Sequence, residues 1–343
     1  MERWTFKGEE VEVVSGYKYL GLTLSPKLSV TQAVADMVVK AKQKVVSILR
    51  SLRKVGCADW DVFIKIFDVQ IQPALLYASE IWGMARVETV ERVHLFALKR
   101  YLAISKRTPS MMVYGETGRF PLYVNSYRNC VRYWLRLITM QDDRLPKLAY
   151  KTSCSLSKEG KNSWANKVKY VLCSFGFGEA WVNQGVGNPN LFLYEFTERV
   201  KVCFQQDWHW KVESDDRFVD YRLLKVDFGI CEHIKKIPAF LRGPFLRLRL
   251  GVSGIKCHLN RFQSEENADL VCPFCPSRCE DERHFLFSCP GNDAIRPNCL
   301  VQATDRSHLY ERTMAPTNED HLRSIAWFIF KAFKIRTKFL EEN

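Results

Sequence analysis

The chain has 343 residues, of which 47% are hydrophobic and 26% are charged, proportions of an ordinary globular protein that exclude wholesale disorder. Lysine and arginine (51) exceed aspartate and glutamate (38) to give a formal net charge of +13, which favours an anionic partner such as nucleic acid. No apolar run approaches the roughly eighteen residues of a transmembrane helix, so no membrane partner is expected. The first ten residues lack the apolar segment of a signal peptide, and we therefore expect an intracellular protein, in the nucleus or the cytoplasm.

The N-terminal residues 1–28 are predicted to form β structure. Two apolar segments flank the turn-forming Lys7-Gly8-Glu9, which indicates a hairpin. A third short strand is expected over Tyr17–Leu24. Because three short strands bury little surface by themselves, we expect this segment to pack against another part of the protein.

From residue 29 the spacing of apolar residues becomes helical. Apolar side chains recur every three to four residues between Val30 and Leu52, which predicts a helix that ends near Gly56. Prolines and glycines between 109 and 121 predict a loop. Residues 29–150 are expected to form one helical domain. Its further helices are predicted at about 59–82 (interrupted near Pro73), 88–103 and 124–140.

Small polar residues predict a linker at 151–163. This linker opens a helical connection region over 151–262, which ends in a basic segment. Its helices are expected at about 164–172, 191–206 and 218–225. A zinc knuckle over 263–300, and a helix at about 321–340 within 301–343, complete the chain. The predicted fold class is therefore mainly α, with short N-terminal β strands, a helical bundle, a second helical region, a small knuckle and a C-terminal helix.

Five of the twelve cysteines fall between residues 272 and 299. Cys272, Cys275, His284 and Cys289 follow the pattern C-x2-C-x8-H-x4-C, which supplies four ligands for tetrahedral zinc and leaves no open position. The sequence therefore predicts one structural zinc ion. Cys279 and Cys299 are alternative ligands, and the remaining explanation is a set of unpaired core thiols with a chance histidine. The other seven cysteines are scattered and are expected to be buried thiols.

Three stretches carry many basic residues and almost no acids: one between Asp36 and Asp59, one between Glu91 and Asp142, and one over 235–261. Several cations on one connected surface bind phosphates, with an affinity that falls as salt rises. The alternatives are solvated helix faces, or arginines that cap helix ends or lie along the core by their apolar stems. The candidate nucleic-acid contacts are Lys40, Lys44, Arg50, Arg242, Arg247, Arg249, Lys256 and Arg261.

No complete catalytic set is recognisable in the sequence. Polymerases and nucleases that use two metal ions need several converging carboxylates. The two Asp-Asp pairs, at 142–143 and 215–216, are predicted to lie in a helix-end turn and a polar loop. No phosphate-binding glycine loop and no nucleophile–histidine signature is present. We therefore expect that this chain is not an enzyme on its own.

Three segments resemble the C-terminal part of reverse transcriptases from LINE-like, non-LTR retrotransposons. Gly16-Tyr-Lys-Tyr-Leu-Gly-Leu-Thr-Leu, with the basic helix after it, is similar to the end of their palm and the start of their thumb. Ile71-Gln-Pro-Ala-Leu-Leu-Tyr-Ala-Ser-Glu-Ile-Trp-Gly looks like the next thumb helix. Leu248-Arg-Leu-Gly-Val-Ser and the cysteine–histidine segment that ends at Pro290 are similar to their CCHC knuckle region. The resemblance implies a helical thumb-like domain and RNA or DNA as the partner.

The chain also departs from this family. The family's polymerase motif, an aromatic residue followed by x-Asp-Asp on a palm hairpin, is not matched, and neither are its endonuclease motifs. The residues before Gly16 are too few to hold fingers and a palm. The resemblance therefore implies a nucleic-acid-binding C-terminal part without polymerase chemistry, with the palm and fingers of a parent polyprotein as a further partner.

Two other functions remain open at this stage. The chain is alternatively a helical protein-interaction scaffold, in which zinc only holds a loop together and the positive charge is incidental. A third possibility is one part of an active polymerase that assembles with a separate palm. The sequence does not distinguish RNA from DNA as the bound nucleic acid.

Overall fold

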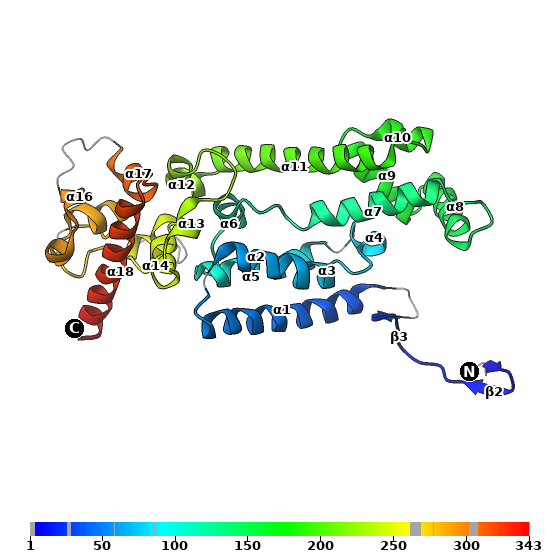
Figure 1. Ribbon diagram of the computed structural model, residues 1–343, viewed down its shortest axis with the longest axis horizontal. Helices are drawn as coiled ribbons and strands as arrows, with labels where there is room; N and C mark the ends of the chain where they lie inside the picture. The colour runs from blue at the N-terminus through cyan, green and yellow to red at the C-terminus, as the bar shows by residue number, and fades with distance from the viewer. Residues whose placement is uncertain are drawn as a thin grey trace. The chain divides into compact units, whose positions relative to one another are not determined.

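The computed structural model describes residues 4–25, 29–57, 59–85, 87–260, 269–276, 278–301 and 308–342 (Figure 1). The protein is mainly helical, with 69% helix and 4% strand, which confirms the predicted fold class. The elements in chain order are β1 (Trp4–Phe6), β2 (Glu9–Val11), β3 (Tyr17–Tyr19), β4 (Leu22–Leu24), α1 (Thr31–Lys54), α2 (Trp60–Ile66), η1 (Phe67–Ile71), α3 (Gln72–Leu75), α4 (Ser79–Trp82), α5 (Val87–Leu102), α6 (Ser110–Thr117), α7 (Tyr123–Ile138), α8 (Leu145–Lys158), α9 (Trp164–Ser174), α10 (Gly178–Asn183), α11 (Pro189–Ser214), η2 (Asp216–Phe218), α12 (Val219–Leu224), α13 (Glu232–Lys236), α14 (Ala239–Arg249), α15 (Lys256–Asn260), η3 (His284–Ser288), η4 (Pro290–Ile295), α16 (Asn298–Val301), α17 (Leu309–Met314) and α18 (Glu319–Glu342).

The N-terminal strands form two separate hairpins. β1 pairs with β2 antiparallel, as expected from the Lys7-Gly8 turn. The predicted third strand is instead a second hairpin, in which Tyr17 pairs with Leu24 and Tyr19 with Leu22. The prediction was wrong because Leu20 and Gly21 have positive φ values of 47° and 89°, a turn conformation that only the glycine adopts without strain.

The chain divides into two compact units that interleave in sequence. The first contains residues 1–48, 66–93 and 122–197, and the second contains 49–65, 94–121 and 198–343. These units cut across the five consecutive segments expected from the sequence. That functional division of the chain stays a prediction.

The first unit is organised around α7, which packs against α4, α8 and α9. Trp134 of α7 is completely buried, and its indole Nε1 donates to the Tyr150 hydroxyl of α8 at 3.0 Å. The Trp164 indole of α9 donates to the carbonyl oxygen of Glu80 at 2.9 Å. Both indole N–H groups therefore have partners, as buried tryptophans require.

The linker predicted at 151–163 is wrong for most of its length. α8 continues to Lys158, and only residues 159–163 lie outside helices. The serines that suggested a linker have hydrogen-bond partners: the Ser155 hydroxyl donates to the Lys151 carbonyl of the same helix at 3.2 Å, and the Ser153 hydroxyl accepts from the backbone N–H of Ala165 on α9 at 3.0 Å. Such bonds allow small polar residues to lie in a helix.

The loop predicted around 109–121 contains the buried helix α6 of the second unit. Gly115 had indicated a loop, but it allows a close approach between helices. A Cβ atom there would lie 2.5 Å from the Tyr221 hydroxyl and 2.6 Å from the Trp208 ring. Trp208 is completely buried and donates from Nε1 to the carbonyl oxygen of Met111 at 2.8 Å. The glycine is therefore needed for packing rather than for a turn.

A buried ion cluster joins α6, α13 and α14 in the second unit. Glu116 is 0% exposed, Arg249 is 3% exposed and His233 is 6% exposed. Arg249 Nε donates to Glu116 Oε1 at 3.1 Å, and His233 Nε2 lies 2.5 Å from Glu116 Oε2. The terminal nitrogens of Arg249 donate to the carbonyl oxygens of Leu224 (2.9 Å) and Met314. The cluster is thus almost fully hydrogen-bonded, as a buried ion pair must be to persist.

The cluster changes the pKa values of its members. Burial acts to raise the pKa of Glu116, but Arg249 and His233 outweigh burial and hold this pKa far below its ordinary value. Burial lowers the pKa of His233 although Glu116 opposes the shift. Near neutral pH the folded protein therefore contains a charged Glu116 and a neutral His233.

Both shifts make the folded protein less stable in acid. A depressed glutamate pKa adds stability above the unfolded value of about 4.3, and that stability is lost as pH falls further. A histidine whose pKa is lowered by folding also loses stability below about pH 6.5, because the unfolded chain takes up the proton more readily.

We expect Glu116→Gln to lower the free energy of unfolding at pH 7.5 by about 3–5 kcal/mol, because Arg249 is left buried without its counterion. The difference between variant and wild type should narrow as pH falls below about 4.3, where Glu116 takes up a proton in the unfolded wild-type chain. Urea unfolding between pH 7.5 and 3.5 measures this difference. A difference that stays constant over this range would contradict the assignment.

Candidate metal centre and nucleic-acid interface

Four side chains of the knuckle converge on one point. The ligand atoms of Cys272, Cys275, His284 and Cys289 all lie within 4.8 Å of one another, an arrangement that can hold a metal ion. The Cys272 and Cys289 sulfurs are 3.7 Å apart, and Cys275 Sγ is 3.0 Å from His284 Nε2. Cys272, Cys289 and His284 are 2%, 2% and 6% exposed. The pattern read from the sequence thus corresponds to one cluster in space.

Short backbone bonds position these four ligands. The Cys272 N–H donates to the carbonyl oxygen of Arg278 at 2.8 Å, and this closes the loop that carries the first two cysteines. η3 begins at His284, and the Cys289 N–H just after it donates to the His284 carbonyl oxygen at 2.8 Å. One helical turn therefore places the last two ligands side by side.

Two side chains support the histidine ligand. The Ser288 hydroxyl lies 3.3 Å from His284 Nδ1, and Asp281 Oδ1 accepts from the His284 backbone N–H at 2.6 Å. A partner on Nδ1 leaves Nε2 for a metal ion and fixes the orientation of the ring. Phe285 and Leu286 are buried next to the ligands.

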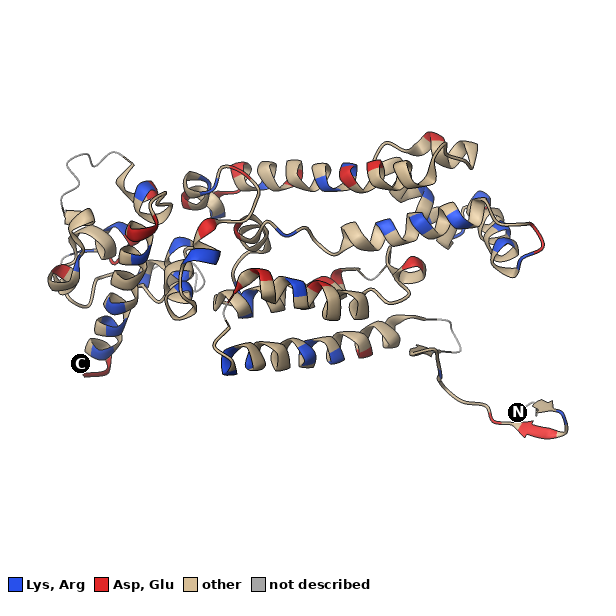
Figure 2. Cartoon of the chain, in the orientation of Figure 1, with Lys and Arg blue, Asp and Glu red and all other residues tan. Residues whose placement is uncertain are grey.

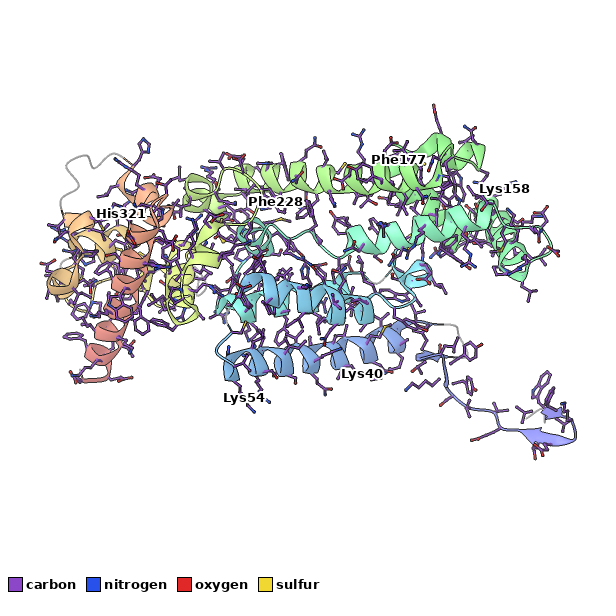
Figure 3. The ribbon with its side chains drawn as sticks, in the orientation of Figure 1. Lys40, Lys54, Lys158, Phe177, Phe228 and His321 are labelled. Atoms are coloured by element: carbon purple, nitrogen blue, oxygen red, sulfur yellow. The ribbon has the colours of Figure 1, made fainter. Side chains whose placement is uncertain are left out.

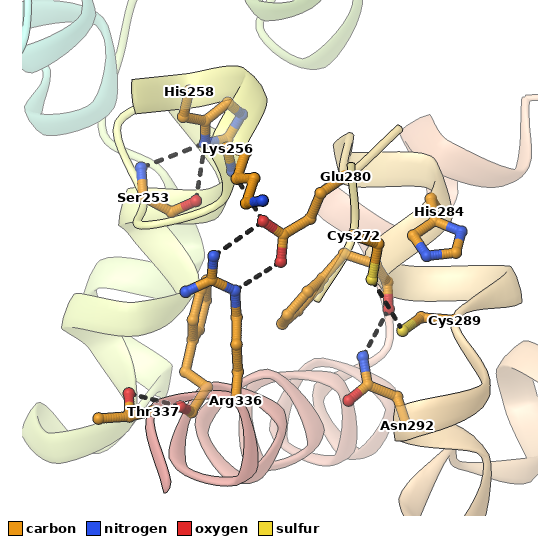
Figure 4. A network of polar contacts seen from close by, with 12 residues as sticks. Ser253, Lys256, His258, Cys272, Glu280, His284, Cys289, Asn292, Arg336 and Thr337 are labelled. Carbon is orange, nitrogen blue, oxygen red and sulfur yellow. Dashed lines mark hydrogen bonds and ion pairs between the residues drawn. The ribbon is translucent and has the colours of Figure 1, made fainter. Parts of the chain in front are cut away.

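A bidentate ion pair attaches the knuckle to α18 (Figure 4). Arg336 and Glu280 are 8% and 1% exposed, and Arg336 donates to both carboxylate oxygens, with Nη2 2.8 Å from Oε2. The backbone N–H of Lys256 also donates to Glu280 Oε2 at 2.8 Å. The Phe285 and Phe333 rings are in contact, with centroids 4.8 Å apart. The loop that carries the candidate metal ligands is therefore held against α18 by charge and by ring packing.

Sequence reasoning missed both members of this pair. Neither Arg336 nor Glu280 is among the site residues predicted from the sequence. A signal for Arg336 was present, because it continues the buried positions Ile325, Ile329 and Ala332 at helical spacing. The burial of Glu280 left no comparable signal.

Neither alternative cysteine ligand joins the cluster. Cys279 is exposed, and its sulfur lies 3.2 Å from that of Cys257 on α15. Cys299 is half-buried on α16. Neither belongs to the group of ligand atoms formed by the four predicted residues.

Glu116, Cys231 and His233 form a second group with ligand atoms close enough for a metal ion. In this group, however, both carboxylate oxygens of Glu116 already have partners, and one of them is the guanidinium of Arg249. A fixed positive charge in hydrogen-bond contact opposes a cation at the same carboxylate. We therefore assign this group to the buried ion cluster and not to a metal site.

The three candidate contacts on α1 are exposed. Lys40, Lys44 and Arg50 are on the solvent side of the helix, and Figure 3 shows the Lys40 side chain extending from its outer surface. Lys44 Nζ donates to the carbonyl oxygen of Gln70 at 3.4 Å. Their outward orientation is as predicted, and their contact with nucleic acid stays a prediction.

Two candidate contacts on α14 are in the interior, and their prediction as surface contacts is wrong. Arg249 belongs to the buried ion cluster described above. Arg242 is 3% exposed, donates from Nη2 to the Ile237 carbonyl oxygen at 3.4 Å and lies over the Tyr101 ring at 4.7 Å. Neither guanidinium is accessible to a phosphate. Both agree with the alternative that these arginines lie in the core.

The other candidates near the knuckle differ in accessibility. Arg247 is exposed, and its Nε donates to the Gly243 carbonyl oxygen of the same helix at 3.3 Å. Lys256 is half-buried, and its Nζ lies 2.5 Å from Asp269 Oδ2. Arg261 lies outside the described residues.

The two Asp-Asp pairs lie in separate turns, and each contributes to an ion pair. Asp142 Oδ1 is 2.9 Å from Lys151 Nζ, in the turn between α7 and α8. Asp215 precedes η2, where it accepts from the Arg217 backbone N–H at 3.0 Å and pairs with the Arg217 side chain at 2.6 Å. Local ion pairs of this kind are typical of solvated turns.

We expect Arg336→Met to lower the free energy of unfolding by about 3–5 kcal/mol, because Glu280 stays buried without its counterion. Arg323→Met on the same helix removes an exposed pair with Glu319 and should cost less than about 1 kcal/mol. Urea unfolding of the metal-loaded protein measures both variants. An equal loss of unfolding free energy in the two variants would contradict a larger contribution from the buried Arg336–Glu280 pair.

Among the described residues, no helix combines the length and the apolar character needed to cross a bilayer. No family model matches the chain, and no curated protein and no solved structure matches it. The geometry of the site and the residues of the sequence therefore carry the functional argument.

Proposed function

We propose that this protein binds RNA or DNA, and that a structural zinc ion holds its knuckle together. The observation that carries the proposal is the surface of α1. The helix has a single acid, Asp36, and its basic residues are all exposed: Lys40, Lys42, Lys44, Arg50, Arg53 and Lys54 (Figure 2). Exposed cations along one helix that has a single acid suit a phosphate backbone.

Zinc is the metal ion that suits the knuckle best. Three cysteines and one histidine are a common structural zinc set, with Zn–S bonds of about 2.3 Å. Two sulfurs at tetrahedral positions around such an ion are about 3.8 Å apart, and the 3.7 Å between Cys272 and Cys289 supports this assignment. Four protein ligands leave no position for a substrate, which favours a structural role over a catalytic one.

We also propose a relation to the C-terminal part of non-LTR retrotransposon reverse transcriptases. This proposal rests on the sequence segments at 16–24, 71–83 and 248–290. It implies that the chain handles a template or target strand and does not synthesise DNA on its own. Polymerisation in this family would need the palm carboxylates of another segment.

We expect one zinc ion per chain in protein purified without chelators. Cys275→Ser should abolish stoichiometric zinc, because it removes one of four ligands. Cys279→Ser is the matched control, because this thiol lies four residues away and outside the cluster. Elemental analysis measures the content. Zinc-free wild type, or equal zinc in the two variants, would refute the assignment.

We expect salt-dependent nucleic-acid binding that depends on α1. Replacing Lys40, Lys44 and Arg50 by glutamine should flatten the slope of log affinity against log salt by about 2 to 3, since each lost phosphate contact contributes about 0.7 to 0.9. Fluorescence anisotropy with labelled single-stranded and duplex oligonucleotides between 50 and 200 mM salt measures this slope.

The matched control removes the same net charge elsewhere. Lys161, Lys201 and Lys211 each pair with a neighbouring acid, at 2.8, 2.7 and 2.8 Å, and their replacement by glutamine should leave the slope close to that of wild type. Equal effects of the two triple variants would mean that only net charge matters. A wild-type protein that binds neither probe would favour the protein-interaction scaffold instead.

A further inference from the structure

An exposed aromatic cluster lies where α14 meets α18 in the second unit. The Phe240, Trp327 and Phe330 rings contact one another, with centroid distances of 5.7 Å for Phe240–Trp327, 5.6 Å for Phe240–Phe330 and 5.7 Å for Trp327–Phe330. Phe240 is 55% exposed and Trp327 is 43% exposed. Phe330 is half-buried and so less exposed than these two rings, whereas Trp134 and Trp208 are completely buried.

Two lysines of α18 lie over this cluster. Lys331 Nζ is 5.4 Å from the Trp327 ring centroid, and Lys334 Nζ is 4.6 Å from that of Phe330. Both lysines are exposed. Between Ile325 and Leu340 α18 has no acid, and α14 has none over its whole length. The two helices therefore combine flat apolar rings with positive charge, and neither has an acid along these stretches.

This combination matches the chemistry of a single nucleic-acid strand. Unpaired bases have flat faces that stack on aromatic rings, and the linked phosphates are attracted to nearby cations. A purely apolar protein partner would not need the lysines. A duplex would not use the rings, because its bases are already stacked on one another.

We propose that Phe240, Trp327 and Phe330, with Lys331 and Lys334, form a stacking platform for the unpaired bases of single-stranded nucleic acid. This inference rests on the proposed function, and it specifies the form of nucleic acid and a contact surface other than α1. Stacking is tolerant of base identity, so the platform selects for strandedness rather than for sequence.

The test compares substitutions at Trp327 with a substitution at another exposed tryptophan. Trp327→Leu keeps an apolar side chain but removes the aromatic face, whereas Trp327→Phe keeps a ring. Trp210→Leu is the matched control, because Trp210 is 66% exposed on α11, between Asp207 and Glu213. Circular dichroism and thermal melting of each zinc-loaded variant establish that it is folded.

The probes are fluorescein-labelled oligo(dT), oligo(U) and a duplex of the same length, measured by anisotropy at fixed salt. We expect Trp327→Leu to weaken binding of both single strands at least about fivefold, the lower limit of the loss when one base–aromatic stack is removed. Duplex binding should stay within about twofold of wild type. Trp327→Phe should retain most of the single-strand affinity, and Trp210→Leu should match wild type.

A double variant tests the platform without changing its rings. Lys331 and Lys334 replaced together by glutamine should lower single-strand affinity and flatten its salt dependence by about 1.4, or about 0.7 for each phosphate contact. The platform is refuted, while the proposed function stands, if wild type binds both probe types and Trp327→Leu binds them as Trp210→Leu does. If wild type binds no probe in a salt-dependent way, the proposed function fails, and the platform with it.

Discussion

Two of the buried guanidinium groups, those of Arg249 and Arg336, determine how the second unit is assembled. An arginine cannot relieve burial by losing its proton, so it persists in the interior only with anionic and carbonyl partners. Arg249 has Glu116 and two backbone carbonyls, and Arg336 has both oxygens of Glu280. The first pair joins residues 133 apart in sequence, and the second joins residues 56 apart. The position of α14 on α6 and of the metal-ligating loop on α18 therefore depends on two long-range ion pairs.

The dependence of buried arginines on distant partners also explains which basic residues were wrongly predicted to be surface contacts. The segment Leu246-Arg-Leu-Arg-Leu250 alternates in sequence, but in α14 neighbouring arginines two positions apart point about 200° from each other. Arg247 consequently faces solvent while Arg249 enters the core. Glu116, the partner of Arg249, is the single acid in a long basic stretch. No local feature of the sequence connects Glu116 with Arg249. A charge pattern alone cannot distinguish a buried cation from an exposed one.

Features that depend on local spacing were predictable, and features that depend on distant packing were not. The apolar period of α1 and the C-x2-C-x8-H-x4-C ligand spacing are local, and both correspond to the structure. Gly115 is also a local signal, but a glycine indicates a loop only when no distant side chain packs against it. Trp208 and Tyr221 come from elements far along the chain and pack directly against Gly115, where two helices approach each other closely. The same holds for Arg336, whose buried carboxylate partner is separated from it by most of the knuckle.

Cations that are paired with protein groups and cations without carboxylate partners lie in different parts of the protein: the former near the knuckle, the latter on α1 and at Lys331 and Lys334 of α18. Near the metal ligands, Arg296 donates to the carbonyl oxygens of Leu286 and Cys289, and Lys256 pairs with Asp269. These cations contribute to the fold of the knuckle, so they offer little to a phosphate. The basic residues of α1, together with Lys331 and Lys334 of α18, are exposed without such carboxylate partners. The net charge of +13 is therefore a weaker predictor of nucleic-acid binding than the division between paired and accessible cations. Only accessible cations release counterions when a phosphate binds. In the proposed function, a metal ion in the knuckle would contribute to nucleic-acid binding indirectly, because it would hold together the segment that Glu280 and Phe285 fix to α18.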